Sequence, residues 1–306
     1  MAFLISKVSG YLFRNNILSF RVLRLLYLAL LGVILAFGCA QKTDDIKPTP
    51  WTINDGDLVT SGKYRAVTVS DLDNDGYLDI VGGGAFPGTV AIWYGDGSGS
   101  MTVPQSLPFK GDVRSITVAD FDEDGDMDIA LSIQRETSGI MVWLNKSERR
   151  WIRSVSPIEI NNYEGIETAD VNKDGHMDII AANATSDTKG GIQVWLGDGS
   201  GAWDLESGPT VTGIFMDVAL ADFDQNGTLD IAGAGWGRFG ALKVWFGDGA
   251  GGWSATAPLS KGSFYALSIG DINADGNMDI LAGSYRQGVL VFLLYLMLRM
   301  TRLLMA

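Results

Sequence analysis

The chain has 306 residues, enough for one large all-β domain or two ordinary ones, and its 39 glycines against 8 prolines indicate many tight turns between short strands. The formal net charge is −13 at pH 7; because residues 1–38 carry four basic side chains and no acid, the remainder carries −17. A domain with this much negative charge repels the phosphate groups of nucleic acid, which is therefore not expected as a partner. The single cysteine, Cys39, excludes a disulfide within the chain.

Residues 1–38 have the layout of an export signal, because basic residues lead into an apolar stretch at 25–37 that Gly38 ends. This stretch is too short for a membrane span, which needs about 20 residues. The position of Cys39 directly after it resembles a bacterial lipoprotein signal, in which the cysteine is lipidated and becomes the first residue of the mature protein.

Ala36 and Phe37 depart from the usual lipoprotein pattern, so an uncleaved anchor or an ordinary signal peptide is the alternative. Each of these signals predicts a domain outside the cytoplasm. Ala40, in place of an aspartate, resembles lipoproteins sorted to the outer membrane, which implies a lipid-anchored protein at the outer membrane or cell surface of a bacterium. Residues 39–50 are polar with two prolines and are predicted to be a tether.

The body of the chain repeats with a period of about 50 residues. A ten-residue Asp loop, DLDNDGYLDI in its first copy, occurs five times. We call the copies loops 1 to 5, and they begin at Asp71, Asp120, Asp170, Asp222 and Asp271. A second segment with a tryptophan and a Gly-Asp-Gly turn follows at Ile92, Val194 and Val244, and VWLNKSER from Val142 is a degenerate copy of it. Five tandem units predict a repeat architecture.

Each unit is predicted to contain four short strands. Apolar residues alternate with period two, as at Ile116 and Val118 and again at Ile129 and Leu131, and turn signals recur between the strands. These features predict an all-β fold, a β-propeller of about five four-stranded blades over residues 51–293, with a stacked β-solenoid as the alternative. Eight of the nine tryptophans fall in two repeating columns and are predicted to be packing residues.

The Asp loops have the composition of metal sites. Counted from the first aspartate, oxygen-bearing side chains occupy positions 1, 3, 5 and 9 of every loop. These candidate ligands are Asp71, Asp73, Asp75 and Asp79; Asp120, Asp122, Asp124 and Asp128; Asp170, Asn172, Asp174 and Asp178; Asp222, Asp224, Asn226 and Asp230; and Asp271, Asn273, Asp275 and Asp279. Position 6 is always glycine, which permits a sharp turn around an ion.

The predicted metal is Ca²⁺, about one ion for each repeat and up to five in all. Clustered carboxylates repel one another, and a hard dication with six to eight oxygen ligands removes that cost. Magnesium prefers to keep water ligands, and zinc would need histidine or cysteine. Position 12 carries no acid, which excludes a helix-loop-helix calcium site; solvated Asp-Gly turns without metal are the alternative.

The D-x-D-x-D-G-x-x-D loops with their following strands resemble the FG-GAP or VCBS-type repeats of integrin α-subunits and many bacterial surface proteins. The resemblance covers about residues 51–292 and implies a calcium ion between the first two strands of each blade. Most such propellers have seven blades, whereas this sequence shows five loops. A chain truncated from a seven-bladed parent is therefore a further interpretation.

The repeat pattern breaks at the C-terminal end of the sequence. After Phe292 the expected Gly-Asp-Gly turn is replaced by an apolar tail at 294–306, which is interpreted as a frameshift or truncation or, alternatively, as a membrane helix interrupted by arginines. The segment 51–60 aligns with the outer strand of a blade although it precedes loop 1. It is predicted to complete the last blade and close the ring.

The connections between the second and third strands are predicted to gather on the face opposite the Asp loops. Their aromatic and arginine side chains are of the types that anchor interfaces, although capping of the blade ends is the alternative. These candidate ligand-binding residues are Phe86, Arg135, Trp236, Arg238, Phe239, Tyr285 and Arg286. The predicted partner is a protein or a glycan, and the predicted function is an extracytoplasmic binding, adhesion or scaffolding module.

Enzyme chemistry finds little support in the sequence. The single histidine, His176, occupies the variable position 7 of loop 3 and is predicted to be exposed, and no nucleophile elbow is present. The alternative function is a carbohydrate-active lyase or hydrolase that uses acids outside the loops, such as Glu164 or Glu167. A chain without a function of its own is a third possibility.

Overall fold

The computed structural model describes residues 63–86, 88–102, 104–135, 138–154, 161–237, 240–256, 259–285 and 288–292. The chain divides into a unit Met1–Asn54 and a unit Asp55–Ala306, and every described residue belongs to the second. The predicted export signal, the tether, the closing strand at 51–60 and the apolar tail at 294–306 lie outside the described residues. Within the described ranges, no helix is long and apolar enough to cross a membrane.

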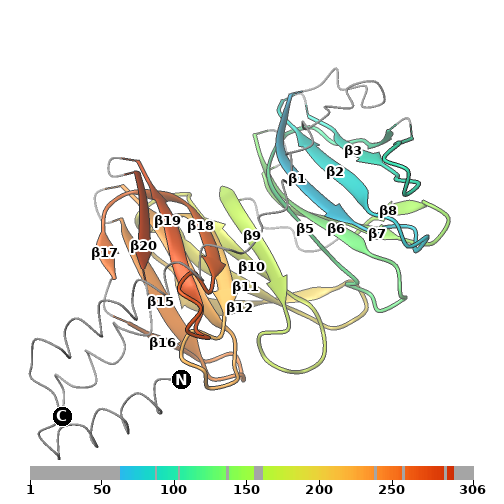
Figure 1. Ribbon diagram of the computed structural model, residues 1–306. Helices are drawn as coiled ribbons and strands as arrows, with labels where there is room; N and C mark the ends of the chain where they lie inside the picture. The colour runs from blue at the N-terminus through green and yellow to red at the C-terminus, as the bar shows by residue number, and fades with distance from the viewer. Residues whose placement is uncertain are drawn as a thin grey trace, which may run out of the picture. The chain divides into compact units, whose positions relative to one another are not determined.

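The described residues form five antiparallel sheets arranged as blades (Figure 1), which confirms the all-β propeller prediction. The first sheet contains β1 (Tyr64–Ser70), β2 (Asp79–Gly84), β3 (Val90–Trp93) and β4 (Gln105–Leu107). The second contains β5 (Asp112–Ala119), β6 (Asp128–Gln134), β7 (Gly139–Asn145) and β8 (Trp151–Arg153). The third contains β9 (Tyr163–Ala169), β10 (Asp178–Asn183), β11 (Gly191–Gly197) and β12 (Trp203–Thr210).

The fourth sheet contains β13 (Ile214–Ala221), β14 (Asp230–Trp236), β15 (Ala241–Gly247) and β16 (Trp253–Ala255), with β17 (Ser260–Lys261) paired to β15. The fifth contains β18 (Phe264–Gly270), β19 (Asp279–Ser284) and β20 (Gly288–Phe292). Each Asp loop therefore joins the first strand of a sheet to the second. The prediction of four strands per unit is confirmed in the first four sheets, whereas three strands of the fifth are described.

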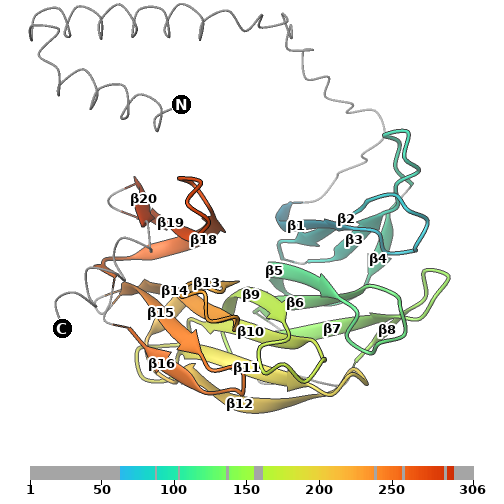
Figure 2. The same cartoon turned by 60° about the horizontal axis from the view of Figure 1, so that its bottom comes forward.

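Neighbouring sheets pack face to face through four apolar cores, one for each interface. The first strands β1, β5, β9, β13 and β18 follow one another side by side (Figure 2). The second strands of the three middle sheets are buried on both faces, as β6 shows: Ile129 and Leu131 pack toward the first sheet, whereas Ala130 packs toward the third. Two-sided burial explains why these strands read as continuous apolar runs.

Packing between sheets also constrains the glycines of the second strands. A Cβ atom on Gly83 would lie 2.4 Å from the Cγ1 atom of Val113 in the next sheet, so only glycine permits this approach. The third-strand tryptophans Trp93, Trp143, Trp195 and Trp245 are all at least nine-tenths buried, which confirms their predicted packing role.

Position 2 of each of the first four Asp loops inserts into the core shared with the following sheet. Phe121 is 2% exposed, and its ring lies edge-on to Trp203 of the third sheet with centroids 5.4 Å apart. Leu72, Val171 and Phe223 are likewise buried. Ile272 of loop 5 is 48% exposed because no described sheet follows the fifth.

Candidate functional site

The five Asp loops share one backbone conformation. The position 1 carboxylate accepts a hydrogen bond from the N–H of the position 6 glycine at 2.8 to 3.0 Å in every loop. The position 5 side-chain oxygen accepts one from the N–H of position 7 at 2.7 to 3.1 Å. These bonds wrap the chain around its own oxygen atoms, so the candidate ligands converge from one short segment.

Position 6 requires glycine because of its backbone conformation, and not because a side chain there would clash with a neighbour. Its φ lies between 85° and 96° in all five loops, a region that residues with a Cβ rarely adopt. A Cβ atom built on any of these glycines would meet nothing within 4 Å. Position 4 also has a positive φ, between 55° and 61°, although none of its residues is glycine. Such strain in five copies indicates that the surrounding bonds hold the loop firmly.

The side chain at position 4 reaches the next loop along the chain. Asn74 donates from Nδ2 to the carboxylate of Asp126 at 2.8 Å, and Lys173 donates to the carbonyl oxygen of Gly227 at 2.6 Å. Glu123 of loop 2 likewise contacts the Nδ1 atom of His176, which raises the pKa of that imidazole. His176 therefore links two loops instead of standing alone on the surface.

The position 9 aspartate ties each loop to its sheet. It is 0% exposed in all five loops, and it accepts a hydrogen bond from the N–H of position 2 at 2.7 to 3.1 Å. In the first four sheets its other oxygen accepts an N–H from the end of the third strand at 2.7 to 2.9 Å. The corresponding residue of the fifth sheet lies outside the described part of the chain. Position 9 thus has a structural role that its prediction as a simple metal ligand did not include.

Burial disfavours ionisation of the position 9 carboxylates of loops 1 to 4. Desolvation raises the pKa of Asp128 to about 7 and the pKa values of Asp178 and Asp230 to about 6, and the charges at positions 1, 3 and 5 add to the shift. The pKa of Asp79 is raised for the same reasons. A cation bound among these groups would favour their charged forms.

The geometry of the loops fits a metal ion. Ligand atoms lie within 4.8 Å of one another in three acidic clusters, namely Asp71, Asp73 and Asp79; Asp120, Asp122 and Asp128; and Asp222, Asp224 and Asp230. The Oδ1 atoms of Asp71 and Asp122 are buried without a hydrogen-bond partner, which is costly for a carboxylate oxygen unless a cation lies against it. The donors are all oxygen atoms, the set that calcium prefers.

Loops 3 and 5 have asparagine at position 3, where the other loops have aspartate. The Nδ2 atom of Asn172 donates to Asp174 at 2.8 Å, and that of Asn273 donates to Asp275 at 3.1 Å. The asparagine thus forms a hydrogen bond where a second carboxylate would repel the aspartate, and its carbonyl oxygen could turn to an ion. The structure therefore brings acidic ligands together in loops 1, 2 and 4, and in loops 3 and 5 it shows the paired side chains of positions 3 and 5.

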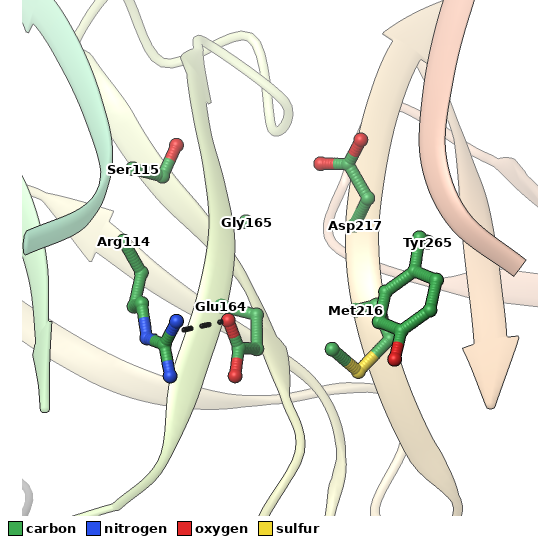
Figure 3. A pocket seen from close by; sticks show the side chains of 7 residues that line it. All are labelled: Arg114, Ser115, Glu164, Gly165, Met216, Asp217 and Tyr265. Atoms are coloured by element: carbon green, nitrogen blue, oxygen red, sulfur yellow. Dashed lines mark ion pairs between the residues drawn. The ribbon is translucent and has the colours of Figure 1, made fainter. Parts of the chain in front are cut away.

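A pocket of about 510 Å³ opens at the other end of the blades, where the first strands begin. It is lined by Arg114 and Ser115 from β5, Glu164 and Gly165 from β9, Met216 and Asp217 from β13, and Tyr265 from β18 (Figure 3). The Arg114 and Glu164 side chains face each other with Nε and Oε2 3.7 Å apart. Gln134 bridges them through two hydrogen bonds of 2.8 Å.

Two further acids have raised pKa values near this pocket. Desolvation raises the pKa of Asp217 to about 6, although its carboxylate accepts the backbone N–H groups of Leu267 and Val218. Glu167 is an exposed residue of β9, and partial desolvation of its carboxyl together with the Asp217 charge raises its pKa. Glu164, an acid that the sequence left uncommitted, is engaged by Arg114 and Gln134.

An exposed aromatic cluster adjoins the pocket at Tyr265. The rings of Trp236 and Tyr265 lie 4.2 Å apart between centroids, and Tyr285 stands edge-on to Trp236 at 5.4 Å. Tyr265 and Tyr285 are 47% and 68% exposed. Sequence reasoning identified Trp236 and Tyr285 but missed Tyr265, because it lies within a strand and its outward orientation depends on the irregular register between Phe264 and Ala266.

The other predicted ligand residues separate into two groups. Arg135 lies over the ring of Phe86 at 5.5 Å and bonds the Asp112 carboxylate with its Nε atom at 2.7 Å. These two residues, from the first two sheets, form a pair of their own. Arg238, Phe239 and Arg286 lie outside the described residues.

The Asp loops match a known family of protein repeats. The FG-GAP-like repeat matches residues 71–131 and 170–233, each of which begins at the first aspartate of an Asp loop. This chain contains FG-GAP-like repeats. The FG-GAP-like repeats thus confirm the resemblance that the sequence predicted. No curated protein sequence matches the chain.

Three solved structures of low sequence identity are similar to this chain. A lectin from Agrocybe aegerita, described as recognising non-reducing terminal N-acetylglucosamine, is 19% identical with a TM-score of 0.53 over 76% of this chain. BBS1N in complex with ARL6DN is 13% identical with a TM-score of 0.50, also over 76% of this chain. The rhamnogalacturonan lyase YesW is 15% identical with a TM-score of 0.47, over 75% of this chain and 48% of its own. This chain covers 63% of the length of the lectin and 63% of the length of BBS1N.

The raised pKa values predict how stability depends on pH. An aspartate with a pKa of about 3.9 when unfolded and 6 to 7 when folded binds its proton more tightly in the folded state. It stabilises the fold fully at acidic pH, and this contribution is lost as pH rises through 6 to 7. With chelator present, the Tm is therefore expected to fall by several degrees between pH 5 and pH 8.

Millimolar calcium is expected to remove most of this fall by stabilising the ionised carboxylates. Glu167 and Asp217 titrate in the same range but lie outside the loops, so they contribute equally to both curves, and the difference between the curves isolates the loops. The measurement is a set of melting curves at several pH values with calcium or with chelator. Superimposable curves would show that the loops are turns that bind no calcium.

Proposed function

We propose that this chain is an extracytoplasmic calcium-binding β-propeller that acts as a binding module, with calcium in the Asp loops and its ligand at the opposite end of the blades. The observation that carries the proposal is the separation of two kinds of surface. Clustered carboxylates lie at one end of the sheets, and a polar pocket beside exposed aromatic rings lies at the other.

Calcium has a structural part in this proposal. An ion that binds only the folded chain stabilises it by about 2.7 kcal/mol for each site when its concentration is a hundred times Kd. A domain of ordinary stability has about 5 to 15 kcal/mol in total, so two occupied loops would already matter. Calcium would in this way hold the blades in place for the ligand-binding end.

The side chains at the ligand-binding end favour a glycan. Exposed aromatic rings such as Tyr265 and Tyr285 offer flat apolar faces, and Arg114, Glu164 and Asp217 offer donors and acceptors for hydroxyl groups at a short distance from one of those rings. Several polar groups beside exposed aromatic rings suit a sugar better than a large apolar ligand. The lectin that shares the fold supports the same class of ligand.

The test is a glycan array probed with the calcium-loaded protein and its variants. Tyr265→Ala and Tyr285→Ala are each expected to weaken binding to the preferred glycan by about two- to tenfold, because one lost stacking contact is worth about 0.5 to 1.5 kcal/mol. Tyr77→Ala provides the matched control, since this tyrosine is 48% exposed on an Asp loop, at the other end of its sheet.

Three outcomes of the array can be distinguished. Loss of binding in the Tyr265 and Tyr285 variants alone supports the ligand-binding end. Equal binding by all variants, or no binding to any glycan, contradicts it. Cleavage of a bound polysaccharide during incubation would instead favour the carbohydrate-active enzyme.

We also propose that the protein is lipid-anchored through Cys39, which lies outside the described residues. The support is the basic and apolar segment that ends at the only cysteine. When the full chain is produced in a bacterium with a labelled fatty acid, the label is expected in the wild type and absent from Cys39→Ser. Equal labelling of both proteins would contradict the anchor.

A further inference from the structure

The hairpin between β7 and β8 reverses the charge found at the same place in the first, third and fourth sheets. The first, third and fourth sheets have aspartate there, namely Asp96, Asp198 and Asp248, and each folds back onto the backbone of its own turn. The second sheet has Lys146, followed by Ser147, Glu148 and Arg149 in place of the Gly-rich turn. This is the degenerate copy of the second repeat segment.

The substituted hairpin keeps a backbone that favours glycine. Ser147, Glu148 and Arg149 have φ values of 57°, 51° and 60° in succession, where the other hairpins place glycines at the first and third of these positions. Three successive residues with a Cβ in the left-handed region are strained. The side-chain contacts of Lys146 and Arg149 therefore help to hold the turn in a backbone conformation that its residues disfavour.

Lys146 reaches into loop 2. Its Nζ atom contacts the Asp122 carboxylate and lies 3.0 Å from Oδ2 of Asp124, so it bridges positions 3 and 5, two of the candidate metal ligands. The Asp122 side chain is only 4% exposed. The ammonium group thus supplies positive charge at the place where a bound ion would join the same two carboxylates.

Arg149 reaches loop 1 in the neighbouring sheet. Its Nη2 and Nε atoms lie 2.6 and 3.0 Å from Oδ2 of Asp73, the position 3 ligand. The guanidinium lies over the ring of Tyr94 at 3.9 Å, and Gln105 donates to the Arg149 carbonyl oxygen at 3.0 Å. The arginine is therefore held in place by the first sheet before any ion arrives.

The two loops that receive these cations are the most acidic ones. Loops 1 and 2 have aspartate at all four ligand positions, whereas loops 3, 4 and 5 have three aspartates and one asparagine. Among the described residues, no ion pair reaches the carboxylates of loops 3 to 5. The loops that have a fourth aspartate are thus the loops that receive a lysine or arginine side chain.

We propose that the β7–β8 hairpin supplies resident cations to loops 1 and 2, which hold these loops folded without calcium and make them bind calcium more weakly than loops 3 to 5. This inference rests on the proposed calcium binding. A fixed positive charge a few ångströms from an incoming dication opposes its binding strongly where solvent is partly excluded. The protein would then contain two classes of calcium site with different functions.

The test is isothermal titration of the chelator-treated protein with calcium. The wild type is expected to show about three tight sites and two weak ones. Lys146→Gln should tighten one weak site by about tenfold or more, and Lys146→Gln with Arg149→Gln should tighten both. Both variants should also have a lower Tm in chelator than the wild type, and calcium should restore it.

Two controls separate this effect from charge and folding. Lys261→Gln removes the same charge from an exposed lysine of β17, which pairs with the start of β15 at the end of the sheet opposite loop 4, and should leave both classes unchanged. Lys146→Arg keeps the cation and should retain the wild-type pattern, even if Lys146→Gln folds poorly. Five equivalent sites in the wild type, or no change in Lys146→Gln, would overturn the inference. Absence of calcium binding by every protein would overturn the calcium proposal itself.

Discussion

The buried carboxylate at position 9 of each Asp loop is the interaction on which the rest of the structure depends. It binds the start of its loop, and in four sheets also the end of the third strand, so one side chain fixes the loop, the hairpin and the first two strands together. The cost is a carboxylate removed from water beside other carboxylates, and in loops 1 to 4 this raises its pKa. A cation at the loop offsets that cost, and calcium and the side chains of Lys146 and Arg149 are two ways to supply one.

Because the strands are antiparallel, successive connections lie at opposite ends of each blade, and the two ends carry different side chains. Connections between first and second strands gather the carboxylates, and the opposite connections carry Trp236 and Tyr285 beside the pocket. The apolar cores between sheets join the two ends, since Phe121 follows directly on the first aspartate of loop 2 and is buried against the next sheet. Under the proposed function, calcium binding would therefore stabilise a ligand-binding surface that the ion does not touch.

The Asp loops and strands could be predicted because their signals are local. Alternation at Ile116 and Val118 marks a strand, and glycine at position 6 marks the turn that its positive φ requires. Contacts between sheets could not be predicted in the same way. Arg149 and Asp73 are 76 residues apart, and only the packing of the first two sheets brings them together. Tyr265 was missed because a register irregularity sets its direction.

The account depends most on whether calcium lies within the Asp loops. Diffraction from crystals grown in millimolar calcium, at a wavelength where calcium scatters anomalously, locates the ions directly. We expect anomalous peaks in loops 3 to 5 in contact with the side chains of positions 1, 3 and 5, and weaker or absent peaks in loops 1 and 2. Well-ordered loops without a peak in any of the five would contradict the account.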